Sequence, residues 1–113
     1  MKHTSIDCRH YTAKEILLLL FDLYPELQNS RSRRKRVYIG VTNDTERRAR
    51  EHNITIDEII FCAQTANQRV AAKVEEIAKE LGFEIGDVEY GGNGTNSYSI
   101  YIYAYVITRD SKQ

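Results

Sequence analysis

The sequence has few of the features that accompany secretion or structural metal sites. Its 113 residues include one proline and two cysteines, Cys8 and Cys62. The two cysteines show no Cys-x-x-Cys spacing and have no pair of histidines nearby, which argues against a zinc site and against a disulfide framework. We therefore expect a reduced, cytoplasmic protein.

Long hydrophobic runs and net charge are also scarce. The apolar run at residues 16–21 ends at Asp22 and falls well short of the ~20 residues that a membrane span needs. It follows Asp7 and Arg9, too late in the chain for a signal peptide. Sixteen basic and sixteen acidic residues cancel. This balance argues against long nucleic acid as the main partner, because domains that bind it usually carry a basic field.

What the chain does contain is a mixture of helix and strand patterns. Thr12 and Glu15 form a capping box before an apolar run that stops at Pro25, which predicts a helix over residues 13–24. Residues 28–36 are dense in charge and predict an exposed loop or the start of a strand.

The remaining elements follow from turn residues and hydrophobic spacing. The chain has no regular βαβ rhythm, so we predict a single α+β domain spanning residues 1–113, with three helices and a small, mainly antiparallel sheet. The predicted elements are a strand over 36–41, a helix over 44–52, a strand over 56–63, a helix that Asn67 caps and Gly82 ends, an extended segment over 83–90, a turn over 91–96 and a strand over 98–108.

The last of these strands carries an unusual row of tyrosines. Strict alternation places Tyr101, Tyr103 and Tyr105 on one face, and three large rings in register are too many for a face open to solvent. We expect something to cover them: a second copy of the chain, the hydrophobic first helix, or a ligand with flat rings. If the strand continues, Arg109 projects on the tyrosine face and Asp110 on the other.

Residues 38–52 combine a strand, a turn and a basic helix, and they begin with a Tyr-Ile-Gly triplet. This segment resembles the second half of the GIY-YIG nuclease motif. In that family one tyrosine from each of two strands, an arginine, and a histidine or tyrosine surround the scissile phosphate, and a glutamate on a later helix holds one divalent metal. The resemblance implies Tyr38, Arg47 or Arg48, and His52 as catalytic residues, and Glu75 as the ligand of a magnesium ion.

The first half of that motif is absent from its usual place. The first tyrosine and its strand should come shortly before Tyr38, where residues 25–31 predict no strand, so the sequence predicts a GIY-YIG-like core with the first catalytic strand missing. Structural roles stay open as well: Tyr38 can simply pack in a strand, Arg47 can belong to a solvated helix face, and Glu75 can pair with Lys79 on a helix surface.

The C-terminal part, with an aromatic residue, a Gly-Asn segment and an Ile-Thr-Arg-Asp tail, resembles the phage Thoeris anti-defence proteins of the first type. Those proteins sequester nucleotide signals of bacterial immune systems. The resemblance implies a dimer or larger oligomer, in the cytoplasm of an infected bacterium, that binds glycocyclic ADP-ribose without cleaving it and in some members also binds cyclic trinucleotides. The implied ligand-binding residues are Phe83, Asn93, Arg109 and Asp110, with Arg31, Arg33, Arg36 and Tyr105 as secondary candidates.

From the sequence we therefore predict a non-enzymatic sponge for cyclic nucleotides that needs no cofactor. A magnesium-dependent endonuclease of the GIY-YIG type is the alternative, and a protein-interaction module that uses the tyrosine face is a further one.

Overall fold

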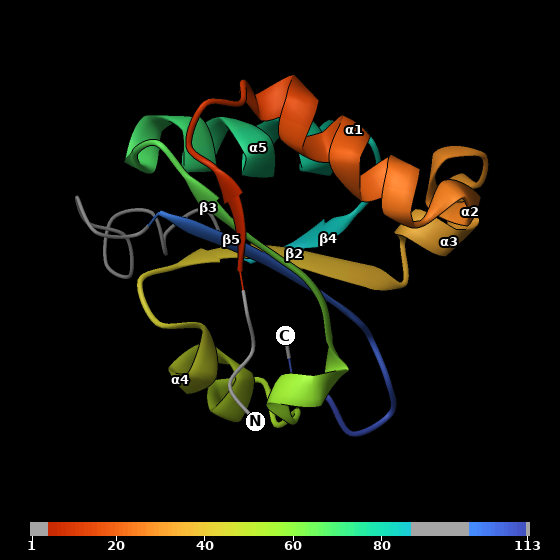
Figure 1. The fold of residues 1–113 in the computed structure, drawn as a ribbon. Coiled ribbons are helices and arrows are strands. Elements are labelled where there is room, and N and C mark those ends of the chain that lie inside the picture. The colour runs from red at the N-terminus through yellow and green to blue at the C-terminus, as the bar shows by residue number, and fades with distance from the viewer. Residues whose placement is uncertain (1–4, 87–99, 113) are drawn as a thin grey trace.

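The structure, a computed structural model, describes residues 5–86 and 100–112 and consists of one sheet with helices on both faces (Figure 1). The sheet order is β1-β3-β5-β2-β4. Its strands are β1 (Ile6–Cys8), β2 (Val37–Thr42), β3 (Ile59–Thr65), β4 (Glu84–Ile85) and β5 (Tyr101–Val106). The helices are α1 (Ala13–Leu23), α2 (Pro25–Gln28), α3 (Arg31–Arg34), α4 (Thr45–Glu51), the 3-10 turn η1 (Ile56–Glu58) and α5 (Gln68–Glu80).

The C-terminal strand β5 lies at the centre of the sheet. It is antiparallel to β2 on one side and to β3 on the other, whereas the short outer strands β1 and β4 pair in parallel. The predicted α+β domain with a mainly antiparallel sheet is confirmed. The order of the strands also brings the last segment of the chain against the Tyr-Ile-Gly segment of β2.

The two faces of the sheet bury different kinds of side chain. Helices α1 and α5 cover the upper face in Figure 1 and pack Leu20 and Val74 against aliphatic side chains such as Ile39 and Ile102. Helix α4 and η1 lie below the sheet, where the buried cluster is rich in tyrosine. The row of tyrosines is therefore covered by this chain's own α4 segment.

Local sequence signals set several of the helix ends. The capping box of α1 is present: Thr12 N donates to Glu15 Oε1 at 2.8 Å, and Glu15 N donates to Thr12 Oγ1 at 3.2 Å. Asn67 Oδ1 accepts from Val70 N at 3.0 Å at the start of α5, and Gly82 follows the end of α5 with φ +99°. These caps confirm the predicted starts of both helices and the predicted stop at Gly82.

Three predictions at the edges of elements were wrong. Residues 31–34 form the helical turn α3, because Ser30 Oγ caps it by accepting from Arg33 N at 3.2 Å. Residues 56–58 form η1 ahead of β3. Strand β5 ends at Val106 and does not reach residue 108, because residues 108–111 form a turn in which Ser111 N donates to Thr108 O at 3.3 Å.

The predicted extended segment over 83–90 is confirmed for the two residues of β4, and its remainder from residue 87, like the predicted turn over 91–96, lies outside the described residues. None of the helices in the described ranges is both long enough and apolar enough to span a membrane.

Candidate functional site

A buried polar cluster lies below the sheet where β2, β5 and α4 meet. We call it the tyrosine cluster and define it as Tyr38, Arg48, His52, Tyr103 and Tyr105. Its rings lie close together: the Tyr38 centroid is 4.6 Å from that of His52, 6.0 Å from that of Tyr103 and 5.2 Å from that of Tyr105. The four rings are at most 2 % exposed. Two strands and one helix therefore place hydroxyls, an imidazole and a guanidinium in one small volume.

Gly40 makes room for this cluster. The antiparallel register of β2 and β5 sets Tyr103 opposite Gly40, and the Tyr103 ring lies across β2 at that point. A Cβ atom on Gly40 would lie 2.5 Å from the Tyr103 hydroxyl oxygen and 2.6 Å from Cζ. Because Gly40 of the Tyr-Ile-Gly triplet has no side chain, the Tyr103 ring of the neighbouring strand can occupy this position.

This close approach gives a testable consequence for folding. We expect Gly40→Ala to lower the free energy of unfolding by about 1–3 kcal/mol, because the new methyl group must displace a fully buried ring. Chemical denaturation of the purified variant measures the loss. In a Tyr103→Ala background the same substitution should cost much less, since the clash is gone. If Gly40→Ala lowers the free energy of unfolding equally in the wild-type and Tyr103→Ala backgrounds, the close approach of Gly40 and Tyr103 is contradicted.

Hydrogen bonds connect the cluster around the Tyr103 hydroxyl. His52 Nε2 lies 2.7 Å from it, and Arg48 Nε donates to it at 3.3 Å. Arg48 also donates from Nη2 to His52 Nε2 at 3.4 Å, while its Nη1 pairs with the Glu51 carboxylate. The guanidinium is thus held by α4 with one edge toward the buried phenols, and its side chain is 21 % exposed.

Burial sets the protonation states inside the cluster. It lowers the pKa of His52, so the imidazole is neutral at pH 7. Burial raises the pKa of Tyr103 and of Tyr105 far above the usual range, although the positive charge of Arg48 opposes the shift. At neutral pH the cluster therefore combines protonated phenols with a neutral imidazole, which can accept a proton.

Glu75 is linked electrostatically to this cluster from α5. Burial raises the pKa of its carboxyl to about 7, and the charge of Arg48 partly offsets the rise. Glu75 in turn raises the pKa of Tyr38 as a smaller contribution beside burial. These mutual effects couple Glu75 electrostatically to Arg48 and Tyr38, although the buried residues of α5 belong to the core on the other face of the sheet.

No hydrogen bond or ion pair to the Glu75 carboxyl occurs in the described ranges. No group of three or more His, Cys, Asp or Glu side chains converges within residues 5–86 and 100–112. As a carboxyl, Glu75 offers one oxygen ligand of the kind that magnesium takes together with waters and phosphate oxygens.

Of the residues that the nuclease resemblance implies, the structure brings Tyr38 and His52 into contact, and Glu75 is coupled electrostatically to Tyr38. For the arginine, Arg48 and not Arg47 faces the cluster. The Arg47 side chain is 42 % exposed and interacts with Glu51 and with Thr42 at the end of β2. Of the two arginines that the sequence left open, Arg48 contacts the cluster, because adjacent residues point about a quarter turn apart on a helix.

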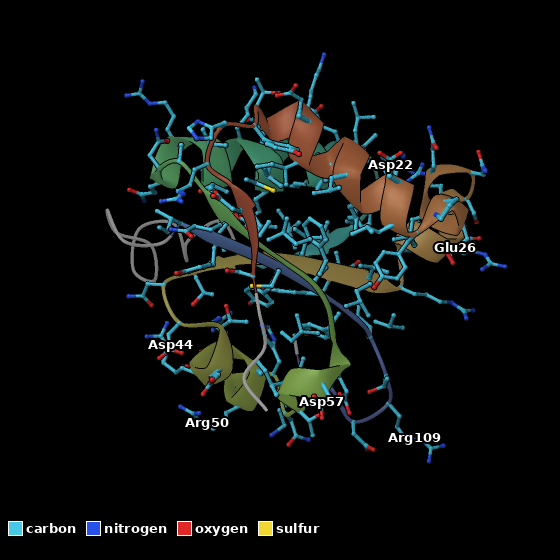
Figure 2. The ribbon with its side chains drawn as sticks, in the orientation of Figure 1. Asp22, Glu26, Asp44, Arg50, Asp57 and Arg109 are labelled. Atoms are coloured by element: carbon cyan, nitrogen blue, oxygen red, sulfur yellow. The ribbon has the colours of Figure 1, made fainter. Side chains whose placement is uncertain are left out.

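The residues implied by the second resemblance lie on different sides of the sheet. Phe83 is 4 % exposed and stacks on Phe21 in the upper core, with ring centroids 6.2 Å apart, so its ring faces are used in packing. Arg109 and Asp110 are exposed on a turn below the sheet, where Figure 2 shows Arg109 pointing away from it. Phe83 therefore does not meet Arg109, and the strand from which Arg109 would project ends at Val106. Asn93 lies outside the described residues.

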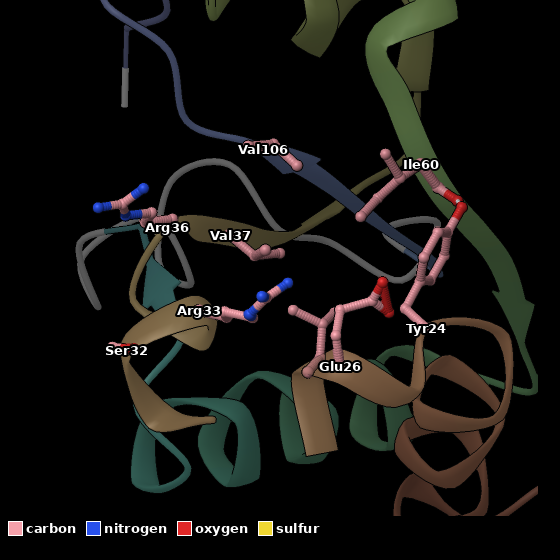
Figure 3. A pocket seen from close by; sticks show the side chains of 9 residues that line it. Tyr24, Glu26, Ser32, Arg33, Arg36, Val37, Ile60 and Val106 are labelled. Carbon is pink, nitrogen blue, oxygen red and sulfur yellow. Dashed lines mark hydrogen bonds between the residues drawn. The ribbon is translucent and has the colours of Figure 1, made fainter. Parts of the chain in front are cut away.

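The secondary arginine candidates also lie away from the tyrosine cluster. Arg31 donates to Glu80 O at 3.4 Å and lies against Gly82. Arg33 and Arg36 line a groove of about 600 Å³ between α2, α3 and the ends of β2 and β5 (Figure 3). The apolar lining of this groove includes Val37 and Ile60, which belong to the core on the α1 and α5 side.

Comparisons of the chain with protein-family models, with curated proteins and with solved structures found no match.

Sequence reasoning did not place Tyr103 in one cluster with Tyr38 and His52. Two sequence features pointed to this cluster. One is the glycine of the Tyr-Ile-Gly triplet, which leaves room for a large neighbouring side chain, and the other is the alternating strand with tyrosines on one face. Nothing in the sequence connects residues so distant along the chain, because strand pairing is set by the whole sheet.

Proposed function

We propose that this protein is a metal-dependent nuclease of the GIY-YIG type in which the strand of the first tyrosine comes last in the chain. The observation that supports this most is the pairing of β5 with β2, which sets Tyr103 opposite Gly40 and next to Arg48 and His52. The Tyr103 ring centroid then lies 6.0 Å from that of Tyr38. In the order of the chain, the first catalytic strand is missing before Tyr38. In space, β5 takes the neighbouring position that the family pattern requires.

Each side chain then has a distinct task at a phosphodiester. The guanidinium of Arg48 neutralises the phosphate charge, for which its fixed donors are well suited. A water gives its proton to the Tyr103 oxygen as it attacks phosphorus, and Tyr103 passes its own proton to His52 Nε2. The phosphorus–oxygen bond to the leaving group breaks, and that oxygen takes a proton from solvent. Tyr38 orients the water and the phosphate from the other strand.

Glu75 would hold the metal in this scheme. A bound magnesium ion supplies positive charge that stabilises the phosphate oxygens in the transition state. The Glu75 carboxyl has no hydrogen bond or ion pair within the described residues and is partly exposed, as is the Arg48 side chain.

Arg48 and Arg47 provide a matched pair for the test. We expect Arg48→Ala to lower the rate of magnesium-dependent nicking of supercoiled plasmid by about 100-fold or more, since it removes the charge that faces the phosphate. Arg47→Ala should stay within a few-fold of wild type. The readout is conversion to open-circular DNA by the purified proteins, with EDTA as the blank. An inactive wild-type protein, or equal losses in the two variants, would contradict the assignment.

Sequestration of a cyclic nucleotide stays a prediction, as do an oligomeric state and a cytoplasmic location. The two functions differ in what is recovered from the protein. Protein incubated with a cyclic nucleotide and magnesium, freed from unbound ligand and then denatured by heat, should release intact nucleotide if it is a sponge. It should release linear product, or retain nothing, if the tyrosine cluster hydrolyses phosphodiesters.

A further inference from the structure

The C-terminal tail after β5 turns back beneath the sheet. Ile107 N still donates to Arg36 O at 2.7 Å, in register with the pairing of β5 and β2. A turn follows, in which Thr108 N donates to Ser111 Oγ at 3.0 Å and Ser111 Oγ donates to Thr108 O at 3.0 Å. The turn reverses the chain and directs its last described residue toward α4.

The tail is joined to the end of α4 by backbone hydrogen bonds. Lys112 N donates to His52 O at 2.6 Å, and Lys112 O lies 2.5 Å from His52 Nδ1. Asn53 Nδ2 donates to Asp110 O at 2.9 Å. The Tyr105 hydroxyl lies 3.0 Å from the same Nδ1 and donates to Lys112 O at 3.4 Å. The main chain of Lys112 thus closes the side of the tyrosine cluster opposite Tyr103.

These partners determine which imidazole nitrogen of His52 carries the proton. A carbonyl oxygen only accepts, so Nδ1 must be the protonated nitrogen that donates to Lys112 O. A guanidinium only donates, so Nε2, which Arg48 Nη2 approaches at 3.4 Å, must offer its lone pair. Both constraints select the same neutral form, and the Tyr103 hydroxyl then donates to Nε2.

We infer that the C-terminal tail is a positioning element, in which the main-chain carbonyl of Lys112 holds His52 in the Nδ1–H form that accepts the proton of Tyr103. This inference deepens the proposed function and rests on it for its catalytic consequence. The hydrogen bond also stabilises the imidazolium that forms when Nε2 gains a proton, because Nδ1–H stays a donor throughout. Without the carbonyl, Tyr105 is left as the neighbour of Nδ1, and a hydroxyl can donate or accept.

The experiment compares two variants of the full chain. A chain that ends at Asp110 lacks the Lys112 carbonyl, whereas Lys112→Ala keeps it and changes a side chain that is exposed. Nitrogen-15 NMR of the imidazole reports the tautomer of His52 directly, with the signal assigned from a His52→Gln sample. Plasmid nicking gives kcat for each protein, and thermal unfolding shows that each is folded.

We expect Lys112→Ala to keep the Nδ1–H form and the wild-type kcat. The shortened chain should show a mixture of tautomers and a kcat lower by about 10- to 100-fold, as is usual when the partner of a catalytic group is removed. A shortened chain that keeps both the pure Nδ1–H form and the wild-type kcat overturns the inference. If wild type cleaves nothing, the proposed function fails, and the NMR spectra alone then decide whether the tail sets the tautomer.

Discussion

Glu75→Gln is expected to stabilise the fold and to abolish cleavage at the same time. Burial raises the pKa of Glu75 to about 7, which means that the folded chain disfavours the carboxylate. Glutamine has nearly the same shape and no charge to desolvate. At pH 8 we expect a gain of about 1–2 kcal/mol in the free energy of unfolding, after allowance for partial solvent screening. Nicking should fall to the background seen with EDTA.

The pH dependence of that gain has a definite sign. The folded-state pKa of about 7 lies above the ordinary value of 4.5, so the folded chain binds the proton more tightly than the unfolded chain does. The stability contributed by the protonated carboxyl is fully present below pH 4.5 and is lost as the pH rises through about 7. Wild type and Glu75→Gln should therefore unfold alike near pH 4.5 and differ most above pH 7. Urea denaturation at pH 5 and pH 8 measures the two differences.

Glu76 offers the control on the same helix. Its side chain is exposed and lies 3.6 Å from Lys73 Nζ, so Glu76→Gln should change neither stability nor nicking appreciably. Excess magnesium should raise the melting temperature of wild type and of Glu76→Gln at pH 8 and leave Glu75→Gln unchanged, because a cation that binds only the folded state stabilises it. A Glu75→Gln protein that still nicks DNA, or that melts lower than wild type at pH 8, would contradict the role of this carboxyl.

The fold was largely predictable from the sequence because its signals are local. Thr12, Asn67 and Gly82 set helix ends through contacts within a few residues, and the alternation of β5 follows from the geometry of any strand. The short turn α3 was not predictable, since Arg34 helps to hold it by donating to Leu81 O at 2.6 Å, far along the chain.

The candidate site was predicted in part, for a similar reason. Tyr38 and His52 belong to one continuous motif, so their spacing identified them. Tyr103 and Lys112 reach the same place only after β5 inserts between β2 and β3, a step that depends on the whole sheet. Under the proposed function, the motif is therefore incomplete along the sequence, and β5 completes it in space.

Tyr103→Phe provides the second large effect and tests that spatial assignment. The substitution removes one oxygen, which takes away both the acceptor for the water's proton and the donor to His52 Nε2. We expect nicking to fall by about 100- to 10,000-fold, the range for loss of a proton-transfer group. Tyr105→Phe is the matched control, since its hydroxyl lies on the Nδ1 side of the same imidazole and should contribute about tenfold at most.

Stability separates this catalytic role from a purely structural one. Each substitution removes one buried hydroxyl bonded to His52, so both variants should lose a similar 1–3 kcal/mol, roughly, of unfolding free energy. A network that served only to hold the lower core together would therefore show equal losses in stability and equal, modest changes in nicking. The proposed function requires that Tyr103→Phe and Tyr105→Phe lose similar unfolding free energy but differ in nicking rate. Tyr103→Phe should be the slower of the two by about tenfold or more. If Tyr105→Phe is instead the slower enzyme, the tyrosine that accepts the proton of the water has been assigned to the wrong position of β5.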